Sequence, residues 1–226
     1  MQRRPTAELL DADSGTPREV ADSLKDLRWF NRWFGGISTV RQVFDSVIRK
    51  TGADALSVLE VASGEGFIPA ILCDEFRQRG LQLNFTLFDR AASHLPANGS
   101  FPKISGDALC LPFHDSSFDV VCCSLFVHHL DPANVVEYIQ EALRVSRVAV
   151  LIHDLVRHPL HLALAYAGVP LYRSRITRND APASVKQAYT ISEMKEFLRT
   201  AGASKIEVTE QYLFRMGVIA WKETAR

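Results

Sequence analysis

From Ala55 onward the chain alternates short apolar runs with segments of helical periodicity, and this alternation limits the folds that it can adopt. Two of the runs, residues 118–126 and 146–154, are apolar almost throughout. Strands of that composition are buried on both faces, which is typical of a parallel sheet between two layers of helices. The alternation therefore predicts the α/β class, with right-handed crossovers between the parallel strands.

The positions of the expected elements follow from the same pattern. We expect strands at residues 56–63, 83–89, 103–105, 118–126 and 146–154, and helices at residues 67–79, 131–145 and 191–201. Two further strand-like runs, residues 204–214 and 216–222, are separated by a very short turn. Parallel pairing needs a long crossover, so these two runs predict an antiparallel hairpin that closes the sheet.

The segments outside the alternation divide the chain into three parts. Residues 1–18 are polar and contain two prolines, which predicts a flexible N-terminal arm. Residues 19–52 hold two amphipathic helical patterns, which we interpret as an N-terminal helical lid. Residues 53–226 form the sheet domain, with an insertion at residues 155–190.

Charge and cysteine content exclude several classes of protein. The chain has 26 Lys plus Arg and 26 Asp plus Glu, whereas a nucleic-acid-binding protein normally carries a basic excess. No apolar run approaches the roughly 18–20 residues of a membrane-spanning helix, and no apolar signal region follows the basic N-terminus. The four cysteines include no CxxC pair and no histidine spacing typical of zinc. We therefore expect a cytoplasmic protein with buried, reduced cysteines and without a bound metal, a membrane span or a nucleic-acid partner. We expect it to be a monomer or a homodimer.

A glycine-containing loop, residues 60–66, joins the first expected strand to the helix that follows. Small residues there let the backbone approach a ligand, and the helix N-terminus offers free N–H groups. Asp89 ends the second strand, where a carboxylate typically accepts hydrogen bonds from a ribose diol. A dinucleotide site needs a third glycine, but Pro69 stands in that register, and Glu65 would repel a pyrophosphate. The loop therefore favours a nucleoside without phosphates.

Three segments, LEVASGEG, LFDRA and GDALCLPFHDSSFDVVCCSLFVHHL, occur in this order. Together they resemble the motifs of the class I S-adenosylmethionine-dependent methyltransferases of the small-molecule type, and the resemblance covers about residues 55–154. It implies a Rossmann-like three-layer sandwich whose seven-stranded, mostly parallel sheet has an antiparallel last strand. It also implies that S-adenosyl-L-methionine lies across the carboxyl ends of the strands, with S-adenosyl-L-homocysteine as the product.

The resemblance also implies which residues hold this cofactor. The residues that would cradle the methionine and ribose are Glu60, Ala62, Ser63, Gly64 and Gly66. The residues that would contact the ribose and adenine are Asp89, Arg90, Asp107 and Ala108. Ser124 and Leu125 would line the methionine amine, and His129 would lie near the cofactor. Ala62 departs from the family, which usually has glycine there; alanine is tolerated if its backbone keeps a negative φ, and on that basis we expect the change to be mild.

Two pairs of polar residues lie at the carboxyl ends of the expected fourth and fifth strands: His128 and His129 follow the fourth strand, and His153 and Asp154 end the fifth. Ligands of such sheets bind at the carboxyl ends of the strands, and histidine can take a proton at neutral pH. We therefore predict His128 as the catalytic or substrate-orienting residue and Asp154 as a second candidate base. Neighbours on a strand point to opposite sides, so we expect only one of the two adjacent histidines to face the pocket. The alternative, that both histidines only shape the loop, remains open.

The insertion at residues 155–190 supplies apolar and aromatic residues for an acceptor pocket. We expect the acceptor to contact Trp33, His153, Tyr166 and Tyr172, with the N-terminal aromatic residues closing the pocket. Ordinary helix packing is an equally open interpretation of these aromatic residues. The basic residues of the insertion would either bind an acidic group of the substrate or form a solvated face; they are Arg173, Arg175, Arg178 and Lys186.

Together these observations predict an O-methyltransferase that acts on a small, phenolic or related hydroxylated acceptor. The segments HDLVRHPL and SRITRNDAPASVKQAYT resemble methyltransferases of bacterial secondary or quinone-type metabolism. C-methylation is the nearest alternative, because an activated aromatic carbon needs a similar pocket and base. An NAD-dependent oxidoreductase and a non-catalytic nucleoside-binding module are alternatives from other classes.

Overall fold

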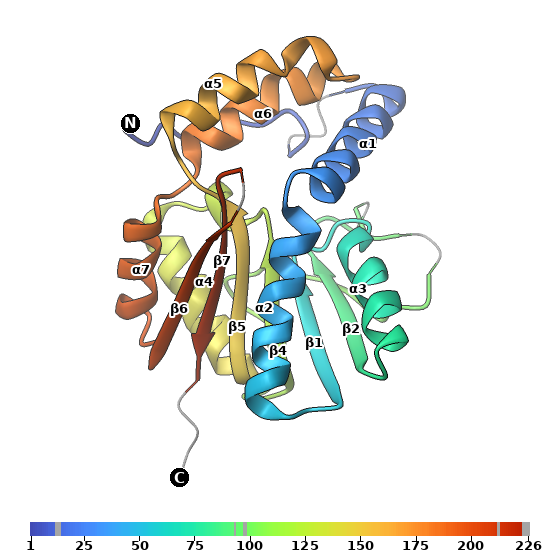
Figure 1. Cartoon of the computed structure of the whole chain (residues 1–226), viewed down its shortest axis with the longest axis vertical. Coiled ribbons are helices and arrows are strands. Elements are labelled where there is room, and N and C mark those ends of the chain that lie inside the picture. The colour runs from blue at the N-terminus through green and yellow to red at the C-terminus, as the bar shows by residue number, and fades with distance from the viewer. Residues whose placement is uncertain (12–14, 93, 97–98, 212, 223–226) are drawn as a thin grey trace.

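The computed structural model describes residues 1–11, 15–92, 94–96, 99–211 and 213–222. Its strands form a seven-stranded sheet in the order β3-β2-β1-β4-β5-β7-β6 (Figure 1). Strands β1 to β5 pair in parallel, and β7 pairs antiparallel with both β5 and β6. The predicted Rossmann-like sandwich with an antiparallel last strand is therefore confirmed. The strands are β1 (Ala55–Val61), β2 (Gln82–Asp89), β3 (Lys103–Ser105), β4 (Phe118–Ser124), β5 (Ser146–Leu155), β6 (Lys205–Gln211) and β7 (Arg215–Trp221).

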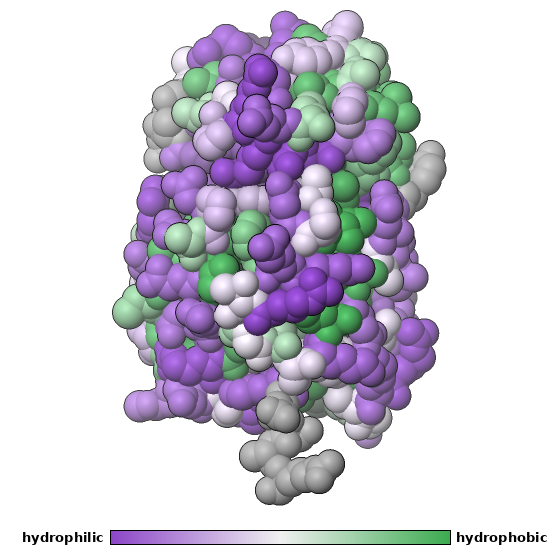
Figure 2. All heavy atoms as spheres, turned by 90° about the vertical axis from the view of Figure 1, so that its left-hand side faces the viewer, coloured by the Kyte–Doolittle hydropathy of each residue, from purple (hydrophilic) through white to green (hydrophobic). Residues whose placement is uncertain are grey.

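Helices cover both faces of the sheet. Helices α2 (Gly36–Thr51) and α3 (Phe67–Gln78) pack on one face, and α4 (Pro132–Val145) and α7 (Ile191–Thr200) pack on the other (Figure 1). Val120 of β4 belongs to the core under α2 and α3, whereas its neighbour Val121 belongs to the core under α4 and α7. This alternation is why the continuously apolar run of β4 indicated burial on both faces. The α7 side of the molecule is mostly hydrophilic, with apolar residues gathered toward one edge (Figure 2).

Three further helices lie above the carboxyl ends of the strands (Figure 1). They are α1 (Pro17–Trp33), α5 (Pro159–Ala167) and α6 (Arg175–Gln187). Helix α6 packs against both α1 and α5. We had not predicted a helix here, because the segment at the start of α6 is polar and Pro182 lies within the helix. The helix forms because the Ser174 side chain accepts a hydrogen bond from the Ile176 N–H at its N-terminus, and because the neighbouring helices bury Ile176 and Ala183.

The end of β4 differs from the prediction. The strand stops at Ser124 instead of continuing to residue 126, and Val127–His129 form a short 3-10 helix, η1. Leu125 has a φ of 55°, which turns the chain out of the strand. The two adjacent histidines therefore lie on a helical turn, so the strand alternation that we used for them does not apply.

The N-terminal arm makes specific contacts over residues 1–11. The Leu9 and Leu10 N–H groups donate to the two carboxylate oxygens of Asp180, at 2.8 and 3.0 Å. The Arg3 guanidinium donates to the carbonyls of Gln187, at 2.7 Å, and Leu130, at 2.9 Å. The polar composition of the arm predicted none of these contacts. They place the arm between α6 and η1, beside the carboxyl ends of β4 and β5.

Two other expectations concern membrane spans and cysteines. Within the described ranges no helix combines the length and apolarity needed to cross a membrane. Cys122 and Cys123 are buried as expected, and Cys73 is partly buried. Cys110 is exposed because it lies in the irregular loop between β3 and β4. The expectation that all four thiols are buried is therefore wrong for Cys110.

Candidate active site

The glycine loop connects β1 to α3, at the centre of the carboxyl edge of the sheet. Gly64 and Gly66 have φ values of 50° and 69°, which glycine adopts without strain. A Cβ added to Gly66 would meet Leu87 Cδ1 at 2.8 Å, so this glycine allows α3 to pack against β2. A Cβ added to Gly64 would meet nothing within 4 Å, so the space in front of this residue is open.

Ala62 departs from the expectation for this loop. Its φ is 54°, in the left-handed region, whereas the expectation of a mild change required a negative value. The expectation was wrong because the chain turns sharply from β1 into the loop at this residue, where the Ser63 N–H donates to the Phe88 carbonyl at 3.1 Å. A left-handed conformation costs an L-residue roughly 1–2 kcal/mol. The alanine therefore stores strain beside the loop that glycine would relieve.

Glu60 is the one acidic residue of β1, and it is 3% exposed. Burial disfavours its charged form and raises its pKa to about 8. The carboxyl group is therefore mostly protonated at neutral pH until a positive charge approaches it. A cationic ligand group in the loop would reverse this preference.

Asp89 ends β2 and faces the glycine loop. Its Oδ2 accepts from the Gly64 N–H at 3.0 Å, and its Oδ1 accepts from the Ala91 N–H at 3.1 Å. His94 Nδ1 lies 3.6 Å from Oδ1. These contacts fix the carboxylate at the edge where two adjacent parallel strands, β1 and β2, end.

Asp107 and Ala108 lie in the loop after β3, and Arg90 directly follows β2. The Asp107 carboxylate accepts from the Leu109 N–H at 2.9 Å and is exposed. The loop packs closely, since a Cβ added to Gly106 would lie 2.7 Å from Phe88 Cζ. Asp107 thus shapes a turn and also presents a carboxylate at the same edge of the sheet as Asp89.

Ser124 and Leu125 continue this edge at the end of β4. Ser124 pairs with His153 of β5, and the Leu125 N–H donates to the His153 carbonyl at 2.8 Å. The structure thus brings the residues with expected cofactor roles to one edge formed by β2, β1 and β4. Their individual roles stay predictions.

His128 and Asp154 form a buried pair that joins η1 to β5. His128 Nδ1 and Asp154 Oδ1 are 2.6 Å apart, and the two side chains are 3% and 1% exposed. The Asp154 carboxylate also accepts from the backbone N–H groups of His128, at 3.2 Å, and Leu155, at 2.7 Å. Burial alone would lower the pKa of His128, but the nearby Asp154 carboxylate outweighs it and raises that pKa to about 10. Burial works against ionisation of Asp154 too, yet the His128 charge keeps the pKa of this carboxyl below its usual value.

Both adjacent histidines face the same cavity, contrary to our expectation for one of them. Their ring centroids are 4.1 Å apart and their planes differ by 34°, so the rings lie one over the other. A 3-10 turn permits this, whereas successive residues on a strand would point apart. His129 Nδ1 lies 2.7 Å from Asp11 Oδ2 of the N-terminal arm.

Glu8, from the N-terminal arm, is a further polar residue of this site that the sequence analysis did not find. It is 9% exposed, and its Oε1 lies 3.7 Å from His128 Nε2. The Gln187 amide and the Ser184 hydroxyl each donate to the same oxygen at 2.6 Å. A single glutamate in a polar arm gives no periodicity or spacing that would have indicated this position.

A cavity of about 360 Å³ lies between helices α1, α5 and α6 and the carboxyl edge of the sheet. His128, Glu8 and Arg215 contribute polar groups to its lining. The Arg215 guanidinium is 6% exposed, and its Nη1 has no hydrogen-bond partner within the described residues. The main apolar and aromatic residues of the lining are Leu27, Trp29, Phe30, Phe34, Leu125, Leu155, Leu164, Leu171, Tyr172, Val185, Leu213 and Phe214.

Of the four expected acceptor contacts, Tyr172 is among the described residues that line the cavity, and Trp33, Tyr166 and His153 are not. Trp33 and Tyr166 are 65% and 51% exposed, because each lies on the outer side of its helix. His153 is 1% exposed and is covered by the strands around it; burial, with the Arg215 charge, lowers its pKa to about 3. Roles of these three residues in acceptor binding therefore have no support from the cavity.

The basic residues of the insertion contact other protein groups. Arg175 pairs with Glu19 at 3.0 Å, and Arg173 lies 4.0 Å from Asp26. The Arg178 guanidinium donates to the Tyr172 carbonyl at 3.2 Å. These contacts join α6 and the segment before it to α1, which supports a structural role for the basic stretch over binding of an acidic substrate group.

Comparisons with known proteins indicate which family this chain resembles. Residues 59–150 match the family model described as a methyltransferase domain, and a comparison with curated protein sequences finds no match. The plantazolicin methyltransferase BpumL, solved with a triazolic desmethylPZN analog and SAH, is 14% identical with a TM-score of 0.71 over 95% of this chain and 93% of its own. Human N-acetylserotonin methyltransferase in complex with SAM is 13% identical, with a TM-score of 0.59 over 82% of this chain. A SAM-dependent methyltransferase from Aquifex aeolicus is 17% identical, with a TM-score of 0.53 over 78% of this chain and 88% of its own.

At these identities the structural similarities establish the fold, and this chain spans 51% of the length of the human enzyme. The fold is the one on which methyltransferases bind S-adenosylmethionine. Residues 59–150 thus match a methyltransferase domain, and the sheet has the fold of solved S-adenosylmethionine-dependent methyltransferases.

The residues of the glycine loop fit this cofactor. Gly64 faces open space, and the buried Ser63 hydroxyl has no hydrogen-bond partner within the described residues. An unpaired buried hydroxyl is costly, so a ligand with polar groups would satisfy it. The buried acid Glu60 suits a cationic ligand, and S-adenosylmethionine carries a sulfonium and an ammonium.

The strain at Ala62 predicts that Ala62→Gly makes the protein more stable. Relief of roughly 1–2 kcal/mol of left-handed strain exceeds the roughly 0.5–1 kcal/mol that glycine loses in backbone entropy. We expect the free energy of unfolding in urea to rise by about 0.5–1 kcal/mol. Ala142→Gly in α4 is the control and should lower it by about 1 kcal/mol. Equal destabilisation by the two substitutions would show that Ala62 is not strained.

The raised pKa of Glu60 predicts a pH-dependent stability. The folded state holds this proton up to a pKa of about 8, against 4.5 in the unfolded chain, so its contribution is present below pH 4.5 and is lost as the pH rises through 8. In thermal unfolding without cofactor, the Tm of the wild type relative to Glu60→Gln should therefore fall between pH 5 and pH 8. The exposed Glu137→Gln is the control and should show no such trend. A constant difference for Glu60→Gln across this range would contradict the assignment.

Proposed function

We propose that the chain transfers the methyl group of S-adenosylmethionine to a hydroxyl group of a small, predominantly apolar and aromatic acceptor. The observation that carries this proposal is the cavity of about 360 Å³, whose lining includes His128 at the carboxyl edge of the sheet. The cavity reaches the proposed cofactor site at Leu125 and His129, which belong to its lining and follow β4, the neighbour of β1 in the sheet. An acceptor in the cavity would thus lie beside the proposed cofactor site.

When bound, S-adenosylmethionine supplies an activated methyl group on its sulfonium. The protein has to place the acceptor oxygen in line with that group, exclude water and take the proton that the hydroxyl releases. His128 is suited to the last task, because its Nε2 faces Glu8 and the cavity while its Nδ1 is held by Asp154. In the free enzyme the Asp154 carboxylate raises the pKa of His128 to about 10 and keeps the ring protonated. His128 must therefore release its Nε2 proton to water first, and it then accepts the acceptor proton in its neutral form.

Asp154 itself acts through His128. Its two oxygens are engaged by the His128 ring and by two backbone N–H groups, and its side chain is 1% exposed. A carboxylate enclosed in this way has no access to an acceptor in the cavity. We therefore assign it the role of a positioning residue, in place of the second base that the sequence indicated.

The cavity lining supports the choice of an oxygenated aromatic acceptor. Phe30 and Tyr172 meet edge to face at 5.4 Å, and Trp29 and Phe34 extend the same aromatic wall. The unpaired guanidinium nitrogen of Arg215 favours an acceptor that carries an oxygen, because a buried donor without a partner is costly. C-methylation of an activated aromatic carbon remains the second candidate, since it would use the same wall and the same base.

The cofactor roles that we propose follow the positions along the sheet edge. Asp89 would bind the ribose hydroxyls, with Asp107 and the Ala108 N–H on the adenine side. The glycine loop and Ser124 would hold the methionine part. These assignments are supported by the common edge on which the residues lie and by the unpaired Ser63 hydroxyl.

The names of two similar structures agree with a small acceptor. One is an N-acetylserotonin methyltransferase and the other a plantazolicin methyltransferase solved with a triazolic analog.

Of the N-terminal helical lid expected at residues 19–52, we propose that α1 alone acts as a lid, since α1 lines the cavity whereas α2 packs on the sheet. We also propose a cytoplasmic location.

Replacing His128 should lower turnover strongly and change cofactor binding little. We expect His128→Asn to lower the rate of S-adenosylhomocysteine release by about 10²- to 10⁴-fold, the range of general base catalysis. The assay should use a panel of phenol, carboxylate, amine and quinol acceptors. Asp154→Asn should also lower the rate, and the exposed His114→Asn is the matched control and should not.

Calorimetric affinity for S-adenosylhomocysteine should change less than threefold in the His128 variant, because the residue lies on the acceptor side. Full turnover in His128→Asn would show that the residue does not ionise the acceptor. Turnover confined to the amine acceptors of the panel would contradict O-methylation.

A further inference from the structure

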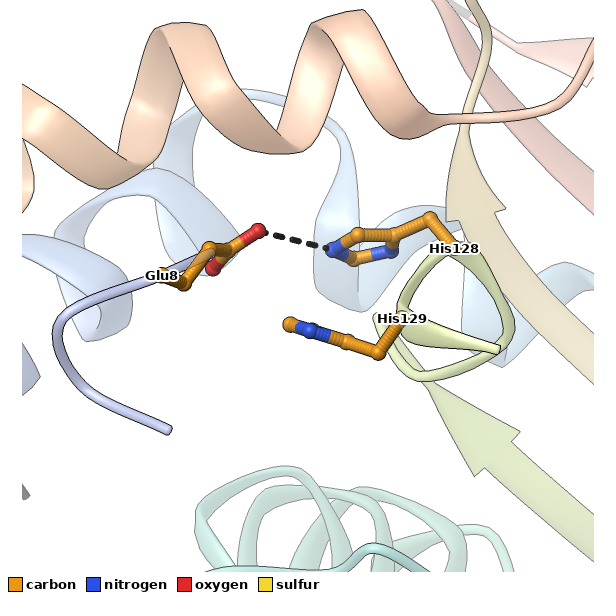
Figure 3. A group of neighbouring side chains, drawn as sticks. All are labelled: Glu8, His128 and His129. Atoms are coloured by element: carbon orange, nitrogen blue, oxygen red, sulfur yellow. Dashed lines mark ion pairs between the residues drawn. The ribbon is translucent and has the colours of Figure 1, made fainter. Parts of the chain in front are cut away.

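Three side chains that line the cavity form a compact cluster of metal-binding groups. Glu8 comes from the N-terminal arm, and His128 and His129 come from η1. One ligand atom of each lies within 4.8 Å of the other two. Figure 3 shows the Glu8 carboxylate pointing at the His128 ring, with the His129 ring beside it. All three residues contribute to the lining of the cavity.

Each imidazole of the cluster is held by a carboxylate at one nitrogen. Asp154 contacts His128 Nδ1 at 2.6 Å, and Asp11 contacts His129 Nδ1 at 2.7 Å. Histidine ligands of metals almost always donate their second ring N–H to a carboxylate, a carbonyl or water, which fixes the ring and makes the other nitrogen a better donor. Because a carboxylate holds Nδ1 of each ring, Nε2 is the atom that each ring can offer to a common ligand.

The position of Glu8 is also fixed. Ser184 and Gln187 of α6 both donate to its Oε1 at 2.6 Å, and the residue is 9% exposed. The cluster and its surroundings contain three further carboxylates, from Asp11, Asp154 and Asp180, against the guanidinium groups of Arg215 and of Arg3, which donates to the His128 carbonyl at 3.2 Å. This excess of negative charge in a buried site favours a divalent cation.

We propose that Glu8, His128 and His129 form a binding site for a divalent transition-metal cation such as Zn²⁺, with an open coordination position toward the acceptor cavity. Two histidines and one glutamate with an open fourth position are a ligand set of catalytic zinc sites. Around zinc, ligand atoms lie roughly 3.3–3.5 Å apart. Glu8 Oε1 and His128 Nε2, at 3.7 Å, need only a small side-chain movement to reach this geometry.

A catalytic role for the cation rests on the proposed methyl transfer. An acceptor oxygen at the open position would be held beside the cofactor edge, and its hydroxyl would become more acidic. His128 would then keep its contact with Asp154 and give its Nε2 to the cation, which would replace the imidazole in ionising the acceptor. The acceptor class that this site selects is one with a hydroxyl or a pair of neighbouring oxygens.

The sequence predicted no metal site, because metal-binding motifs are recognised by ligands that lie close together in the chain. Here the carboxylate comes from the N-terminal arm and both imidazoles come from the turn after β4. Only the docking of the arm between α6 and η1 brings them together.

Zinc binding to the full chain tests the site directly. Metal-free protein titrated with Zn²⁺ in a calorimeter should bind one equivalent with a micromolar or lower Kd. Glu8→Gln and His129→Asn should each weaken this binding at least tenfold, and the exposed Glu210→Gln should leave it unchanged. Thermal unfolding of each variant without metal shows whether it is folded. Absence of stoichiometric binding, or equal affinity in all four proteins, would overturn the site.

Activity separates this proposal from the proposed function. Chelation should lower S-adenosylhomocysteine release on a hydroxylated acceptor at least tenfold, and added Zn²⁺ should restore it, with S-adenosylhomocysteine binding unchanged. Full turnover in chelated protein would exclude a catalytic use of the cation while methyl transfer stands. Stoichiometric zinc binding without turnover on any acceptor would support the site and reject the proposed function.

Discussion

The buried contact between His128 and Asp154 joins the two strand ends on which the rest of the site depends. It holds η1 against the end of β5, and through η1 it fixes where β4 stops and where the N-terminal arm docks. The two charges stabilise each other in a place where neither would be stable alone. Removal of either partner leaves a buried, uncompensated group, so the pair connects the stability of the sheet edge to its chemistry.

The sheet shows what the sequence predicts well. Apolar runs such as residues 118–124 alternate between two cores, and this local pattern defines both the strand and its burial. The closing hairpin was also predictable, because the short turn before Arg215 leaves no room for a crossover. The common position of Asp89 and the glycine loop was predictable as well, since they lie at the ends of adjacent parallel strands.

The acceptor side was much less predictable, because it depends on contacts between distant segments. Glu8 and Asp11 reach the histidines only because Asp180 of α6 binds the backbone of the arm. The backbone of Ala62 adopts a left-handed conformation that its side chain disfavours, and the two adjacent histidines share one face because a 3-10 turn replaces the last residues of a strand. None of these features has a periodicity that a sequence pattern reveals.

We propose that the carboxyl edge of β1 and β2 binds S-adenosylmethionine and positions it for an acceptor in the cavity. Calorimetric titration of the whole chain with S-adenosylhomocysteine, and separately with NAD, tests the first part of this claim most directly. We predict one S-adenosylhomocysteine site per chain, no NAD binding, and a loss of about 1.5–3 kcal/mol in Asp89→Ala from the charge-assisted hydrogen bonds. Binding of NAD without S-adenosylhomocysteine, or an unchanged affinity in Asp89→Ala, would contradict it.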